Sequence, residues 1–230
     1  EATYTFGVVF LVYLLVFSFY SRIPPETEET KEGNLSFGET IKDPRVVIFA
    51  LLFFFHAASE FGVGTWLNIY LKHIQGRSQA EIGFYLSAFF AFFTAGRFLA
   101  SIIVEKVGYI RLVLISAGSS IICILLGLVG PNSFAIFFSI TGFFIATHFP
   151  TIQAAMFETF AANISSILGV TLTANSLGAL VLGSWGIGYI NDQLGVHLGY
   201  GMIIIYLLML ILLLVILHTK YLTGGNNHGT

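Results

Sequence analysis

The chain has 230 residues, of which 56% are hydrophobic and 10% are charged, and its formal net charge is −2. Soluble domains carry about 25% charged residues, so this composition, with a mean hydropathy of +0.87, excludes an ordinary soluble protein and indicates a multi-pass integral membrane protein. The absence of a basic stripe argues against a nucleic-acid partner. The single cysteine, Cys123, excludes an intrachain disulfide and a cysteine-based metal cluster.

Seven apolar segments are long enough to be transmembrane helices, because a helix needs about 20 apolar residues to cross the hydrocarbon core. In chain order we expect them at Ala2–Tyr20, Val46–Leu71, Ala80–Ile103, Leu112–Val129, Phe134–Phe157, Ile167–Ile190 and Gly199–Leu217. Short connections join all but the first pair, which predicts antiparallel neighbours in an all-α membrane fold. Because the chain begins with Glu1 rather than methionine, we expect a fragment or a processed chain.

The connection between the first two segments differs from the others. Residues 21–43 begin with a proline pair and are rich in glutamate, which predicts a solvated linker. This linker separates one helix (residues 1–20) from a six-helix bundle (residues 44–218) and a short tail (residues 219–230). Eight of the ten lysines and arginines are expected on the linker's side of the membrane, so the positive-inside rule predicts that the linker and the C-terminus are cytoplasmic.

The expected helices differ in polarity. Three are apolar nearly all round and suit lipid-facing positions, namely those at residues 2–20, 112–129 and 199–217. The second, fifth and sixth segments carry polar side chains that must line something polar, because a lone polar group facing lipid is costly. An apolar helix recurs at every third segment, which is typical of transporters built from three-helix units.

Two features predict local irregularity or close packing. Pro150 lacks an amide donor and is expected to kink the fifth segment. In the sixth segment, two pairs have the small-xxx-small spacing that favours close helix packing, Ala174 with Gly178 and Ala179 with Gly183.

Glu60 lies near the middle of the second segment. A charge at that depth costs at least about 2.5 kcal/mol unless it faces protein or water, so it marks a functional site by default. His56 precedes it by one helical turn and shares its face. Glu60 can couple proton uptake to transport or accept hydrogen bonds from sugar hydroxyls, and the structural alternative is a protonated or histidine-paired group between helices. His56 pairs with Glu60, binds substrate, or bonds to a backbone carbonyl.

Other side chains in the polar segments are candidates for binding a solute. Trp66 and Tyr70 suit stacking on a sugar ring, although their position near the outer end of the helix equally fits an interfacial aromatic belt. Neutral hydrogen-bonding candidates are Asn68, His148, Gln153 and Asn175. A sugar needs several such donors and acceptors, with aromatic rings covering its apolar face.

The connection between the third and fourth segments contains Gly96-Arg97, then Glu105-Lys106, Gly108 and Arg111. This pattern resembles the second-half copy of the cytoplasmic signature loop of the major facilitator superfamily, with Tyr109 in place of a usual basic residue. The resemblance extends over nearly all of the chain. It implies the C-terminal half of a twelve-helix transporter, preceded by the last helix of the N-terminal half, with residues 21–43 joining the halves and five helices missing. The family's cavity helices then correspond to the second and fifth segments.

Within that superfamily, two short elements resemble the fucose and glucose/galactose permease-like group. One is Glu-x-x-x-Gly-x-Trp-x-x-x-Tyr, carried here by Glu60, Gly64, Trp66 and Tyr70. The other is Phe149-Pro150-Thr151.

A cytoplasmic gate is a further hypothesis. Arg97 and Glu158 are expected at cytoplasmic helix ends, where a charge-assisted pair joined by Glu105 would close that side and break on opening. The resemblance supports this, since the family places such groups at these helix ends. The structural alternative is a set of solvated interfacial charges.

These observations predict a secondary transporter that moves a small polar solute, first of all a monosaccharide, by alternating access, with proton coupling through Glu60 as a hypothesis. The expected partners are the lipid bilayer, an N-terminal six-helix half, the solute and protons, at the plasma (inner) membrane and with no cofactor or metal. One alternative is an exporter of amphipathic compounds. The other is a membrane-embedded enzyme with His56, Glu60 and His148 as metal ligands, disfavoured because no His-Glu-x-x-His motif occurs.

Overall fold

The computed structural model describes residues 11–13 and 37–222, and within those ranges it contains helices and no strands. The expected helix at residues 2–20 lies outside the described part of the chain except for residues 11–13, which are helical. Residues 1–34 and 35–230 form separate units, and residues 37–222 belong to the second unit.

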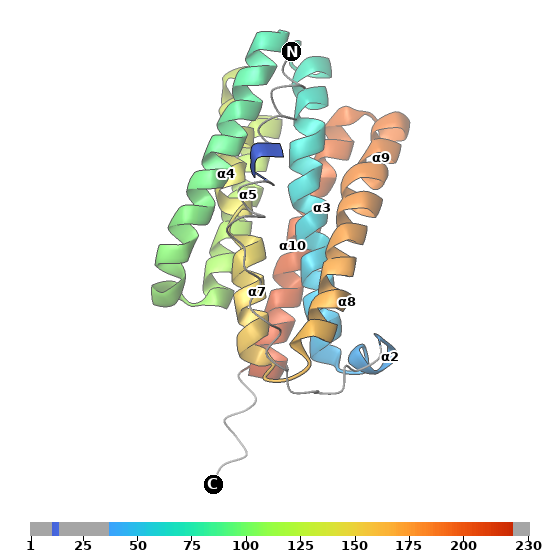
Figure 1. The fold of residues 1–230 in the computed structure, drawn as a ribbon. Coiled ribbons are helices and arrows are strands. Elements are labelled where there is room, and N and C mark those ends of the chain that lie inside the picture. The colour runs from blue at the N-terminus through green and yellow to red at the C-terminus, as the bar shows by residue number, and fades with distance from the viewer. Residues whose placement is uncertain (1–10, 14–36, 223–230) are drawn as a thin grey trace. The chain divides into compact units, whose positions relative to one another are not determined.

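The second unit is a succession of helices drawn in Figure 1. They are α2 (Phe37–Thr40), α3 (Pro44–His73), α4 (Gln79–Val107), α5 (Tyr109–Val129), the 3₁₀ turn η1 (Asn132–Ala135), α6 (Ile136–Ile145), α7 (His148–Thr159), α8 (Ile164–Leu177), the π-helical η2 (Gly178–Gly186), α9 (Ile187–Leu194), α10 (Val196–Leu217) and the π-helical η3 (His218–Leu222). In the described residues six helical stretches are long and apolar enough to cross a membrane: α3, α4, α5, η1–α6–α7, α8–η2–α9 and α10–η3. Each of the six segments expected between residues 46 and 217 falls inside one of them.

Local sequence signals explain where these helices begin. The Asp43 carboxylate accepts a hydrogen bond from the Arg45 amide at 2.8 Å and caps α3, with Pro44 in the first turn, where its missing N–H costs nothing. Ser78 and Glu81 form a reciprocal capping box at the start of α4. Gly108 has a φ of +85°, which side-chain-bearing residues rarely adopt, and it turns the chain from α4 directly into α5.

The six long helices alternate in direction (Figure 1). The α4–α5 and α7–α8 connections therefore lie at the same end as Asp43, which we call the Asp43 end. The α3–α4 connection lies at the opposite end, which we call the His73 end.

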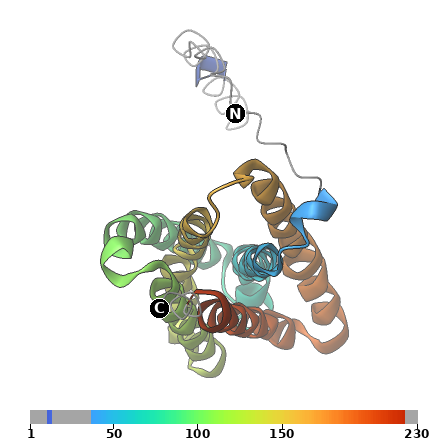
Figure 2. The same ribbon diagram turned by 90° about the horizontal axis from the view of Figure 1, so that it is seen from below.

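Seen along the bundle in Figure 2, α3 and α6–α7 are central, α4 and α8–η2–α9 flank them, and α5 and α10 lie below them in the view. In the most apolar stretch of each helix, 56% of α3 and 61% of α6–α7 is buried, against 17% of α4 and 22% of α8–η2–α9. The buried share is 39% for both α5 and α10. The flanking helices α4 and α8–η2–α9 are the least buried because they pack on fewer neighbours within this bundle, and the expectation that α5 and α10 suit lipid-facing positions stays a prediction.

Glycines allow α8–η2 to lie directly on α3, as the small-xxx-small spacing predicted. A Cβ added at Gly178 would collide with the Phe54 carbonyl, and one at Gly183 would lie 2.9 Å from the Ala58 carbonyl. Any side chain at Gly178 would force the two backbones apart, so these contacts set the register between the helices.

The expected irregularity at Pro150 is present as a break between α6 and α7. Pro150 has no N–H to donate to the carbonyl of Ala146, and the regular helix stops at Ile145 and resumes at His148. The Thr147 amide instead reaches the Phe144 carbonyl at 3.2 Å, in a tighter turn. The break lies at mid-length and leads directly into His148.

Candidate functional site

Glu60 and His56 form a pair at mid-length of α3. His56 Nε2 lies 3.2 Å from Glu60 Oε2, close enough for an ion pair but without hydrogen-bond alignment. The His56 side chain is 2% exposed and that of Glu60 is 22% exposed. Glu60 lies 16 residues after Pro44 and 13 before His73, so about 20 Å of helix separates it from either end. The predicted pairing is present, and it lies at mid-length of α3.

His148 lies on the other side of His56. The two imidazole centroids are 5.7 Å apart at an interplanar angle of 74°, in an edge-to-face arrangement. His148 is fully buried, and neither of its ring nitrogens has a hydrogen-bond partner. A buried polar group without a partner costs about 1–3 kcal/mol, and such a group in a native fold needs a reason. The α6–α7 break therefore places an unpaired imidazole directly behind the Glu60–His56 pair.

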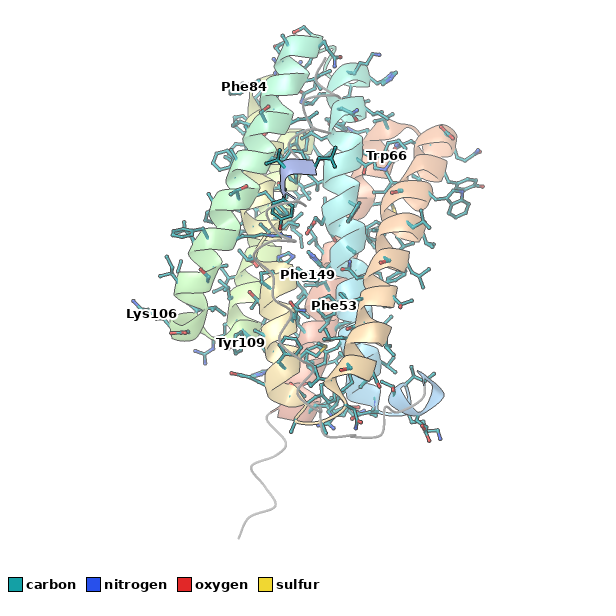
Figure 3. All side chains as sticks on the ribbon, viewed as in Figure 1. Phe53, Trp66, Phe84, Lys106, Tyr109 and Phe149 are labelled. Carbon is teal, nitrogen blue, oxygen red and sulfur yellow. The ribbon has the colours of Figure 1, made fainter. Side chains whose placement is uncertain are left out.

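A cavity of about 180 Å³ opens beside this pair. It is lined by His56, Ala57, Glu60, Phe61, Arg97, Phe149 and Asn175, which come from α3, α4, α7 and α8. Figure 3 shows Phe149 and Phe53 between α7 and α3, where their rings pack edge to face at 5.3 Å. The cavity thus combines one carboxylate, one guanidinium, one imidazole and one amide with two aromatic rings.

The structure corrects the expected position of Arg97. This residue lies ten positions before the end of α4, which is about 15 Å of helix, and it lines the Glu60 cavity rather than a helix end. Its guanidinium lies 4.6 Å from the centroid of the Phe93 ring and interacts electrostatically with the Glu60 carboxylate. The segment expected at residues 80–103 already includes Arg97. The prediction of a helix-end position instead followed from the charged connection that comes soon after Arg97.

Asn175 reaches the cavity from α8, as expected of a residue that could bind a polar solute. Its Oδ1 is buried and has no hydrogen-bond partner. Together with His148, it leaves unpaired polar atoms around the Glu60–His56 pair. Of the two residues, only Asn175 lines the cavity.

Three other candidates do not line this cavity. Asn68 is exposed, and its Oδ1 accepts a hydrogen bond from the Ile69 amide at 2.7 Å. Gln153 is half-buried on α7. Trp66 turns toward α9 and donates its indole N–H to the Gly183 carbonyl at 2.9 Å. Phe61 and Phe149 do line the cavity, which the sequence does not predict: Phe149 stands out only in the Phe-Pro-Thr element, and nothing marks Phe61 among the 24 phenylalanines.

The remaining gate candidates lie at the Asp43 end. Glu158 is exposed in the last turn of α7 and lines a cavity of about 430 Å³ with Tyr109, Arg111 and His218. Glu105 is exposed near the end of α4, next to Lys106, which Figure 3 labels beside Tyr109. Within residues 37–222, no ion pair joins Arg97 to Glu158. The structure therefore does not bring Arg97 and Glu158 together in this conformation, and the gate stays a prediction.

Metal binding finds no geometric support in the described residues, where no group of three or more histidine, cysteine, aspartate or glutamate side chains is placed to hold an ion. His56 Nδ1 and the two His148 nitrogens do not converge with Glu60 on one point. The site is a polar cavity in an apolar bundle.

Comparison with known proteins adds a family and a distant relative. A family model described as Major Facilitator Superfamily matches residues 49–229. A curated protein of Helicobacter pylori (strain ATCC 700392 / 26695), named "Putative glucose/galactose transporter", is 25% identical over 176 residues. The match covers 76% of this chain and 43% of that relative, so the chain spans less than half of the relative's length. The predicted all-α membrane fold and the resemblance stated above are both confirmed.

Proposed function

Since this chain belongs to the Major Facilitator Superfamily, we propose that the protein carrying it is a secondary active transporter for a small polar solute, first of all a monosaccharide. Transport occurs by alternating access, in which this six-helix bundle rocks against an N-terminal half in the plasma (inner) membrane, with the Asp43 end and the C-terminus in the cytoplasm. The name of the Helicobacter relative, which mentions glucose and galactose, supports a sugar.

The observation that carries this proposal is the mid-length cavity beside Glu60. The unpaired Asn175 amide oxygen accepts a hydrogen bond, the Arg97 guanidinium donates several, and the Glu60 carboxylate accepts. Phe61 and Phe149 supply apolar surface for the carbon face of a sugar ring. A neutral polyol needs this mixture, whereas an amphipathic drug does not need three polar groups on one small cavity.

Proton coupling is assigned to Glu60 with His56 as its neighbour. A carboxyl that is 22% exposed in a polar cavity exchanges protons when the cavity is wet and is shielded when it closes. His56, 3.2 Å away, can hold the proton in turn, and the Arg97 charge counters that of the carboxylate when the proton is gone. Arg97, Glu105 and Glu158 remain proposed as residues of the cytoplasmic gate.

The test is uptake by the full-length protein in proteoliposomes, with a panel of labelled monosaccharides and, as competitors, amphipathic cations. The proposal expects saturable uptake of at least one monosaccharide and inhibition by its close epimers. In a matched pair of variants, Asn175→Ala, which removes the cavity amide, raises the KM. Asn132→Ala, which changes an exposed asparagine at the start of η1, leaves it unchanged. Inhibition by amphipathic cations, with no uptake of any sugar, would favour an exporter instead.

A further inference from the structure

The α8–η2–α9 helix contains a nine-residue π-helical stretch, Gly178–Gly186. Hydrogen bonds in a π-helix run from residue i to residue i+5, and such stretches are rare and occur mostly at functional sites. In this protein the stretch lies directly against α3, where Gly183 touches the Ala58 backbone.

Side chains from two other helices donate to consecutive carbonyls of this stretch. The Trp66 indole N–H on α3 donates to the Gly183 carbonyl at 2.9 Å. The Tyr206 hydroxyl on α10 donates to the Leu182 carbonyl at 3.4 Å. The six-membered ring of Trp66 also lies against Gly188, where a Cβ would lie 3.0 Å from two of its carbons. Both the polar and the apolar parts of Trp66 are therefore used to hold the α8–η2–α9 helix.

The same helix brings Asn175 to the Glu60 cavity. Asn175 lies one turn before Gly178, whose contact with the Phe54 carbonyl sets the register of α8 on α3. Phe54 is in turn six residues before Glu60 on α3. The position of the Asn175 oxygen in the Glu60 cavity thus depends on how η2 packs on α3. Trp66 holds η2 on α3 at the end of the stretch away from Asn175.

We infer that Trp66 is a positioning residue for solute binding: its indole N–H holds the π-helical stretch on α3 and so keeps the Asn175 amide facing Glu60. Trp66 does not line the cavity and touches no solute. The inference rests on the proposed function, because it gives Trp66 a role in a site whose solute is itself proposed.

The first experiment uses Trp66→Phe, which keeps an aromatic ring and removes the N–H donor. The chain has two tryptophans, and the second, Trp185, is 68% exposed and stacked on Tyr189, so Trp185→Phe is the matched control. Loss of one hydrogen bond of ordinary strength predicts a rise in the KM of about threefold to tenfold for Trp66→Phe. The maximal rate per folded transporter stays within about twofold, and Trp185→Phe changes neither value. A purely structural role would lower the amount of folded protein and leave the KM unchanged.

The double variant Trp66→Phe/Asn175→Ala shows whether Trp66 acts through Asn175. If it does, the double variant has the same KM as Asn175→Ala alone, because the positioned group is already absent. KM effects that multiply would overturn the inference.

A second readout does not depend on transport. Hydrogen–deuterium exchange of residues 172–188 is expected to be faster in Trp66→Phe than in the parent and unchanged in Trp185→Phe. If Asn175→Ala has no effect on the KM, the proposed role of the cavity fails, and the exchange measurement then decides the positioning claim. Equal exchange in Trp66→Phe and the parent would refute it.

Discussion

Two long helices beside α3 are irregular at mid-length, and they differ in what makes them so. The break between α6 and α7 comes from its own chain, because Pro150 cannot donate to the Ala146 carbonyl. The π-helical stretch η2 contains no proline and receives donors from Trp66 and Tyr206 on neighbouring helices. The first irregularity is therefore fixed by covalent structure, whereas the second depends on tertiary contacts and can be disturbed from another helix.

Both irregular helices also bring polar side chains to the surroundings of the Glu60–His56 pair. The α6–α7 break leads into His148, behind His56, and η2 follows the α8 segment that carries Asn175. Both bring an unpaired polar atom toward the same pair. The following variants test the π-helical stretch and the α6–α7 break separately, in order of decreasing effect on stability.

The largest effect is expected at Gly178, where η2 meets the α3 backbone. In Gly178→Leu the side chain collides with the Phe54 carbonyl, so α3 and η2 must move apart and lose the packing between them. We expect a loss of about 3 kcal/mol or more of stability, seen as little monodisperse protein and a lower Tm. Gly169→Leu on the same helix faces open space and should behave like the parent. Equal behaviour of both variants would show that η2 does not depend on this contact.

His148→Leu removes the buried, unpaired imidazole that follows the α6–α7 break. Because an apolar side chain of similar size leaves no polar atom unsatisfied, we expect stability to rise by about 1–3 kcal/mol while uptake falls. The exposed His73→Leu should change stability by less than about 0.5 kcal/mol. Thermal unfolding in detergent measures both. A destabilised His148→Leu would mean that the imidazole has a partner.

Pro150→Ala tests whether the break is caused by the proline alone. The restored N–H can donate to the Ala146 carbonyl, so we expect a gain of about 1 kcal/mol, a higher Tm and slower uptake as His148 shifts. Pro131→Ala, in the connection before η1, is the control and should leave uptake unchanged. If Pro150→Ala keeps full uptake at parental stability, the break has another cause.

The smallest effect is expected at Asp43, outside both irregular helices. Its hydrogen bond with the Arg45 side chain, above all, holds the pKa of the Asp43 carboxyl below its usual value. A pKa that is lower in the folded state contributes stability above the unfolded pKa, and this contribution is lost as the pH falls through the folded pKa. Asp43→Ala should therefore cost about 0.5–1 kcal/mol at about pH 7 and progressively less as the pH falls below the usual aspartate pKa of about 3.9. A cost that does not vary with pH would assign the effect to the cap geometry alone.

The features that could be predicted from the sequence are those that a local run or spacing of residues determines. Six spans followed from apolar run length, the Glu60–His56 pair from one-turn spacing, and the α6–α7 break from Pro150. The close packing at Gly178 followed from small-residue spacing.

Features that depend on several helices could not be predicted in the same way. The π-helical stretch has no proline, and the side chains that donate to its carbonyls lie more than 20 residues away on α3 and α10. Arg97 was assigned to a gate because the nearby charged loop outweighed its position inside the span. Trp66 is a candidate for sugar stacking because it is aromatic. Its observed partner is a backbone carbonyl, which every residue has, so the sequence cannot predict that hydrogen bond.

The central claim is that Glu60 carries a proton in a solute cavity, and Glu60→Gln tests it most directly. In proteoliposomes of the full-length protein, the parent should accumulate the solute when the pH outside is lower than inside. Glu60→Gln should lose this accumulation but keep exchange of labelled for unlabelled solute, because glutamine keeps the size and an accepting carbonyl oxygen but cannot release a proton. Asp192→Asn, on the exposed face of α9, should act like the parent. Undiminished proton-driven accumulation by Glu60→Gln would contradict the account.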